Sequence, residues 1–152
     1  MMNHKWNVSL AKIFVIFGLA LSLGFAHSDQ RVAKVTEYGI YNDDHELLEA
    51  TKSIKGTRVV RFGFCFEASV NFFDADKYML VQSLSHPEIL EEEDGWPNKG
   101  YSVPRKFKVV DGVAQGCVGY KARKPSEAPL GEWVFSITDG RIELLSFAFV
   151  LN

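Results

Sequence analysis

His86 and the carboxylates that follow it are the residues whose types and spacing could do acid–base chemistry. His86 precedes Pro87, and the run Glu91-Glu92-Glu93-Asp94 follows in the same segment. An imidazole titrates near neutral pH, and a nearby carboxylate can orient it, which is the basis of general acid–base hydrolysis. One hypothesis is therefore a small envelope hydrolase or carbohydrate-active enzyme that uses His86 with nearby carboxylates.

No catalytic constellation accompanies His86 in the sequence. The chain lacks a Gly-x-Ser-x-Gly nucleophile elbow, a His-Glu-x-x-His zinc helix, a P-loop and a Gly-x-Gly-x-x-Gly fingerprint. The acidic run Asp43-Asp44-His45-Glu46 lacks the spacing of a calcium loop, and runs of like charge are more often solvated loops. We therefore expect no catalytic residue, no metal site and no cofactor. The sequence favours a protein that is not an enzyme.

Two aromatic residues suit a contact surface better than they suit catalysis. Trp96 and Tyr101 lie in the segment DGWPNKGYS, whose Gly, Pro and Asn content indicates a loop. Exposed aromatic side chains in loops are common at binding sites. The alternative is that Trp96 folds back as a lid over one open end of the domain. His86, Trp96 and Tyr101 are thus the candidate binding residues.

The composition of the chain excludes several classes of protein. The chain has 152 residues, is 47% hydrophobic and 24% charged, and carries a formal net charge of −2. This is the composition of a globular protein rather than a disordered one, and a nucleic-acid-binding domain would be basic. Two cysteines are too few for a disulfide framework or a four-cysteine zinc site. No nucleic-acid partner is expected.

The first 26 residues have the pattern of a secretory signal peptide. Lys5 and Lys12 precede or flank an uncharged apolar run over residues 13–25, and Ala26 offers a small residue before the cut. A membrane-spanning helix needs about 20 apolar residues, so an uncleaved anchor is the less favoured alternative. Cleavage before His27 changes the net charge from −2 to −4, because the segment contains two lysines and no acid. We expect an exported protein, periplasmic or secreted, without a stable membrane anchor.

Residues 27–152 are expected to form one domain built from strands. Over residues 58–67, Phe62, Phe64 and Phe66 share one parity while Gly63 and Cys65 share the other, which predicts a core face and a solvent face. Asp-Gly at 111–112 and at 139–140 predicts two hairpins. Residues 45–52 and 87–93 could each form a helical turn. The expected strands are 31–41, 58–67, 78–85, 107–110, 113–121, 133–138 and 141–150.

About seven short strands without intervening helices indicate an all-β antiparallel sandwich, with a small closed barrel as the alternative. The sequence also resembles a bacterial family of single-domain proteins classed as a domain of unknown function. The resemblance rests on ordered short motifs, namely EYGIY at 37–41, GTR at 56–58, FGF at 62–64, HP at 86–87, WP at 96–97, GY at 119–120 and GEW at 131–133. It implies an immunoglobulin-like β-sandwich and supplies no activity, cofactor or catalytic residue.

Cys65 and Cys117 are the only cysteines, and export would place them in an oxidising compartment. Both have the parity of outward-facing residues on their strands, so they can meet only if those strands are neighbours in one sheet. The strands are neighbours in an immunoglobulin-like arrangement. We therefore predict a cross-strand disulfide on the outer face, with two free thiols as the alternative.

Together these features favour a binding or interaction module of the cell envelope, whose partner would be an envelope protein or a glycan. The hydrolase that uses His86 is the alternative. A third possibility is an assembly subunit that pairs through an open edge strand.

Overall fold

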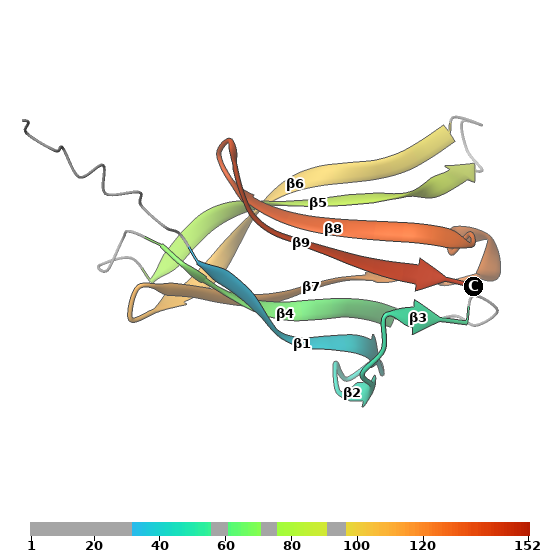
Figure 1. The fold of residues 1–152 in the computed structure, drawn as a ribbon, viewed down its shortest axis with the longest axis horizontal. Coiled ribbons are helices and arrows are strands. Elements are labelled where there is room, and N and C mark those ends of the chain that lie inside the picture. Colours follow the sequence, from blue (N-terminus) through green and yellow to red (C-terminus); the bar gives the residue numbers. More distant parts are fainter. Residues whose placement is uncertain (1–31, 56–60, 71–75, 91–96) are drawn as a thin grey trace, which may run out of the picture.

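The computed structural model describes residues 32–55, 61–70, 76–90 and 97–152. The expected signal peptide, Trp96 and the acidic run at 91–94 lie outside these residues. Nine strands and one 3-10 turn occur in the described part of the chain (Figure 1). They are β1 (Ala33–Tyr41), β2 (Leu47–Glu49), β3 (Ser53–Ile54), β4 (Arg61–Ser69), β5 (Lys77–Leu90), β6 (Pro97–Val110), β7 (Val113–Lys121), η1 (Pro125–Glu127), β8 (Gly131–Asp139) and β9 (Ile142–Leu151).

The all-β prediction is confirmed, and each of the seven expected strands corresponds to one of the long strands β1 and β4–β9. The expected helical turns are wrong where the structure describes them. Residues 47–49 pair with β1 as the short strand β2, and residues 87–90 continue β5. Neither segment has the apolar stripe that would bury one side of a helix, so backbone pairing with an existing strand decides its conformation.

The strands form one hydrogen-bonded sheet in the order β2-β1-β4-β7-β6-β5-β8-β9-β3. The sheet curls into two layers, with β1, β4 and β7 in one and β5, β8 and β9 in the other (Figure 1). All pairings are antiparallel except that of β3 with β9, so the sheet is mixed rather than purely antiparallel.

The core lies between the layers and follows the predicted parity. Phe62, Phe64 and Phe66 of β4 are fully buried, as are Trp133 and Phe135 of β8. Phe62 meets Trp133 edge-on with ring centroids 5.4 Å apart, and it meets Phe135 in the same way at 6.0 Å. Such edge-to-face pairs are a favoured aromatic geometry, and they hold β4 against β8. The opposite parity of β4 consequently faces outward.

The two Asp-Gly hairpins differ in their turns. Asp111 and Gly112 have φ values of 50° and 74°, as a type I′ turn requires, and this prediction is confirmed. The second hairpin is shifted by one residue, because Asp139 pairs with Ile142 and leaves Gly140 and Arg141 as the loop. Only Gly140 has a positive φ there (58°), which is the φ pattern of a type II′ turn.

Strands β6 and β7 separate soon after their hairpin, and this opening positions the candidate site. They pair only from Val110 with Val113 to Lys108 with Gln115. Beyond that point they run apart into the two layers (Figure 1). Pro104 helps to explain the separation, since proline has no N–H to donate to a neighbouring strand. The remainder of β7 is therefore an edge strand among the described residues.

Candidate functional site

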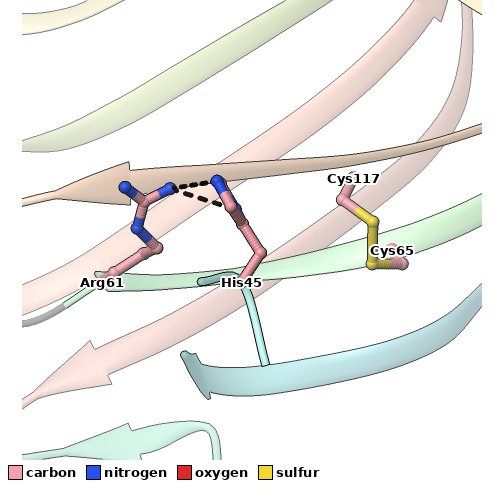
Figure 2. Close-up of a disulfide and its surroundings, with 4 residues drawn as sticks. All are labelled: His45, Arg61, Cys65 and Cys117. Carbon is pink, nitrogen blue, oxygen red and sulfur yellow. Dashed lines mark hydrogen bonds between the residues drawn. A yellow bond between two sulfur atoms is a disulfide. The ribbon is translucent and has the colours of Figure 1, made fainter. Parts of the chain in front are cut away.

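The disulfide prediction is confirmed. Cys65 of β4 and Cys117 of β7 are bonded, lie directly opposite each other in the sheet and have Cα atoms 3.9 Å apart. Cys117 is exposed, so the bond lies on the outer face rather than in the core (Figure 2). The bridge joins residues 52 positions apart in the sequence and fixes the register of β4 against β7.

A pair of glycines lies beside the disulfide on the same face. Gly63 of β4 is opposite Gly119 of β7. A Cβ atom at Gly63 would lie 2.1 Å from the carbonyl oxygen of Val118, and one at Gly119 would lie 2.6 Å from that of Phe62. Neither distance is sterically possible, so this close approach of the two strands requires glycine. The outer face consequently has a floor without side chains next to the disulfide.

A groove of about 440 Å³ lies over these two glycines, and we call it the glycine groove. Four basic or potentially basic side chains line it, whereas no aspartate or glutamate does. Its lining residues are Tyr41, His45, Arg61, Phe62, Gly63, Phe64, Cys65, Arg105, Cys117, Val118, Gly119, Tyr120 and Lys121. A larger depression of about 750 Å³ adjoins the groove and shares Arg61 and Lys121, but Asp43 and Glu49 line it as well. Of the two hollows, only the larger depression has acidic side chains in its lining.

His45 and Arg61 form one end of the groove. His45 lies in the turn between β1 and β2 with a φ of 66°, a conformation that non-glycine residues rarely adopt. Nη1 of Arg61 lies 3.1 Å from Nδ1 and 3.3 Å from Nε2 of this ring (Figure 2). Nε of Arg61 is buried and has no hydrogen-bond partner among the described residues. Buried donors are normally paired, so this end has unused capacity for an acceptor.

Lys121 and Tyr41 complete that end. Nζ of Lys121 donates to Oδ1 of Asp43 at 2.5 Å, and this hydrogen bond lowers the pKa of the exposed Asp43 carboxyl. Burial, reinforced by the charge of the Glu37 carboxylate, raises the pKa of Tyr41 to about 12. Tyr41 is therefore a neutral phenol at neutral pH.

The raised pKa of Tyr41 has a consequence for stability at high pH. The phenol ionises near 10 in the unfolded chain and near 12 in the folded one, so its contribution is complete below pH 10 and is lost as pH rises towards 12. The phenolate absorbance of wild type minus that of a Tyr41→Phe variant isolates the titration of Tyr41. We expect the midpoint of this difference to lie near pH 12. In a Glu37→Gln background the midpoint should fall but stay above 10, because burial remains. A wild-type midpoint near 10 would contradict this environment.

Two of the candidate binding residues from the sequence, His86 and Tyr101, lie on the inner side of the same opening. His86 is only 7% exposed and stacks on Trp133 with ring centroids 4.8 Å apart. Its Nδ1 is 2.8 Å from the carbonyl oxygen of Pro87, so Nδ1 is the protonated nitrogen that donates. Tyr120 packs against Trp133 at 4.8 Å and also lines the glycine groove.

Tyr101 is half-buried, and its hydroxyl accepts a 3.5 Å hydrogen bond from Nε2 of Gln82. Burial raises the pKa of Tyr101, and the charge of Arg105 opposes part of that rise. Tyr101 and Tyr120 also influence each other electrostatically, so the two phenols are neighbours across the opening. The structure thus places His86 and Tyr101 at one opening, whereas Trp96 lies outside the described residues.

The residues that sequence reasoning missed are the two glycines and the basic side chains Arg61, Arg105 and Lys121. A signal for the glycines is present in the sequence, since Gly63-x-Cys65 and Cys117-x-Gly119 are mirror images. Antiparallel pairing of the cysteines necessarily sets the glycines opposite each other. No comparable signal identifies Arg105, because it reaches the groove from the other layer. Among the described residues, no group of three His, Cys, Asp or Glu could hold a metal ion.

No protein-family model and no curated protein matches the sequence. Among solved structures, the chain is similar to an immunoglobulin-like protein from Pseudomonas aeruginosa, with a TM-score of 0.61 at 20% sequence identity. The match covers 82% of this chain and 99% of that one. The likeness supports the expected immunoglobulin-like fold and concerns the fold alone.

Proposed function

We propose that the protein is an exported binding module of the cell envelope that recognises an anionic partner through the glycine groove. The observation that carries this proposal is the charge of the groove. His45, Arg61, Arg105 and Lys121 line it without an acid among them, although the whole chain has a net charge of −2. A basic concavity on an acidic protein attracts anionic groups and repels cationic ones, which gives specificity for anionic partners.

The shape of the groove supports binding by a chain-like partner. Its floor is the backbone around Gly63 and Gly119, so a ligand can approach main-chain atoms directly. The disulfide beside that floor holds the two strands in register. A rigid, pre-formed site of this kind loses little conformational entropy when it binds.

The packing of His86 supports binding over hydrolysis. A general base must reach the proton that it removes, but the His86 ring is only 7% exposed and is stacked on Trp133, so little of it is open to a substrate. His86 therefore has the environment of a residue that shapes the inside of the opening. Trp96, which lies outside the described residues, keeps its proposed role as a contact residue.

The envelope location rests on the apolar N-terminal run together with the surface disulfide. Disulfides persist in oxidising compartments, and this one is exposed rather than shielded in the core. In the part of the chain that the structure describes, no helix has the length and apolar character needed to cross a membrane.

The groove is tested by reversing one of its charges. Arg105 and Lys106 are adjacent, exposed and basic, but only Arg105 lines the groove. We expect Arg105→Glu to lower capture of anionic partners from an envelope extract by about tenfold, because repulsion replaces attraction. Lys106→Glu makes the same change in net charge and should capture like wild type. Quantitative mass spectrometry of the captured proteins and glycans measures both, and equal losses for the two variants would show that the groove does not bind the partner.

A further inference from the structure

We propose that the free edge of β7 takes up an extended acidic peptide of the partner as an additional strand of the sheet. This inference rests on the proposed function and deepens it, since it selects a protein partner over a glycan. It is the mode in which main-chain hydrogen bonds supply affinity and alternate side chains supply specificity.

The hydrogen-bonding pattern of β7 identifies which backbone groups are free. The two-residue hairpin is closed by Val110 and Val113, and such a closing pair is hydrogen-bonded. Because N–H and C=O groups alternate in direction along a strand, Cys117 and Gly119 direct theirs to the same side as Val113. The short Cα separation of Cys65 and Cys117 agrees, since residues that do not exchange backbone hydrogen bonds lie closer together.

No described strand occupies that side of β7 beyond Gln115. Gly119 is exposed and has no side chain, so its exposed surface is backbone, and Cys117 is exposed as well. The two sides of the opening also differ in edge protection. β6 contains Pro104, whereas β7 contains no proline at all. Unprotected edges are templates for pairing, so the opening favours addition to β7 over addition to β6.

The side chains beside the edge define the peptide that fits. On the outer face, Gly119 leaves room for a large side chain of an added strand. Lys121, whose Nζ also holds Asp43, adds positive charge there that favours an aspartate or glutamate. On the inner face, the added strand would place apolar side chains against Val118 and Tyr120. Arg105, which reaches the groove from β6, would meet a second acid. The matching peptide therefore has apolar residues at the positions that face inward, and acidic or large residues at the alternate positions that face outward.

A second copy of this chain is the less favoured occupant. Two β7 edges paired antiparallel would bring two sets of the same basic groove residues together without any acid from the groove lining. Like charges across an interface cost affinity and select against that partner. An acidic peptide has the opposite charge and is the occupant to which the proposal commits.

Two substitutions at Lys121 separate backbone pairing from charge. Lys121 ends β7 and, by the same alternation, directs its N–H to the free side. Lys121→Gln removes the charge and keeps the N–H, whereas Lys121→Pro removes both. The probe is an array of extended peptides of about seven residues that vary in acidity and alternation. Disulfide content and thermal unfolding of each variant verify that the protein is folded.

We expect wild-type protein to select acidic peptides with alternating apolar residues. Lys121→Gln should weaken their binding about threefold, whereas Lys121→Pro should weaken it about thirtyfold, because a backbone hydrogen bond is lost as well. Equal effects of the two variants would overturn strand addition while leaving the basic groove intact. Failure of every peptide to bind would also overturn strand addition. Dimerisation of the free protein through β7 would replace the proposed occupant with a second copy. The proposed function itself fails if Arg105→Glu leaves partner capture unchanged or if Lys106→Glu lowers it equally, and neither result depends on the Lys121 variants.

Discussion

Replacing Cys65 and Cys117 together by serine is expected to lower the free energy of unfolding by about 4 kcal/mol. The bond joins residues 52 positions apart, and a cross-link of that span removes conformational freedom from the unfolded chain at about this magnitude. A marginally stable domain has about 5–15 kcal/mol in total, so the loss would be a large fraction. Chemical denaturation of the two proteins under oxidising conditions measures it.

Reductant supplies the matched control for this prediction. Wild-type protein unfolded in the presence of reductant should have the stability of the double variant, and reductant should not change the variant itself. Alkylation followed by intact-mass measurement should find both thiols masked before reduction and free afterwards. Two thiols that alkylate without reductant would contradict the bond, and a stability difference below about 1 kcal/mol would contradict its entropic role.

Gly63→Ala is expected to cost about 3 kcal/mol, which is the second-largest effect that the structure implies. The new Cβ would lie 2.1 Å from the carbonyl oxygen of Val118, so β4 and β7 would have to move apart. Backbone atoms cannot move aside as the end of a flexible side chain can, and the displacement would act on the floor of the glycine groove. Thermal or chemical unfolding reports the loss.

Gly140→Ala is the control for that substitution. Gly140 has a positive φ of 58°, but an added Cβ would meet nothing within 4 Å. Its cost is the conformational penalty of a left-handed residue alone, about 1 kcal/mol. Equal costs for the two variants would show that the close approach of β4 and β7 is not what requires glycine at position 63.

Local patterns in the sequence were sufficient for much of the fold. Alternation in residues 58–67 predicted that Phe62, Phe64 and Phe66 form the core, and all three are buried. The same parity turned Cys65 and Cys117 outward, which is why their pairing required adjacent strands. These predictions succeeded because a strand with one buried face has a period of two residues in its own sequence.

The strands that could not be predicted depend on pairing with neighbouring strands rather than on the pattern of their own residues. Only residues 107–110 of β6 were expected as a strand, but β6 begins at Pro97. Residues 97–106 contain Gly100 and Pro104, which do not favour a strand, and they are extended because they pair along β5. Leu47–Glu49 likewise forms a strand only through its pairing with β1. Propensity is a weak guide when tertiary pairing supplies the hydrogen bonds.

The glycine groove belongs to this second class. Its basic residues come from β4, β6, β7 and the turn after β1, and only the curl of the sheet brings them together. The candidates chosen from the sequence, His86 and Tyr101, lie at the same opening but are turned inward. Local reasoning thus selected residues at this opening, and it did not identify the basic groove residues on the outer face.

The most direct test of binding through the glycine groove is the affinity of a captured partner for the Arg105→Glu and Lys106→Glu proteins, measured side by side with wild type. Binding through the glycine groove predicts that the dissociation constant rises about tenfold for Arg105→Glu and stays within about twofold of wild type for Lys106→Glu. Wild-type affinity in the Arg105→Glu protein, or an equal loss in both, would contradict binding through the glycine groove.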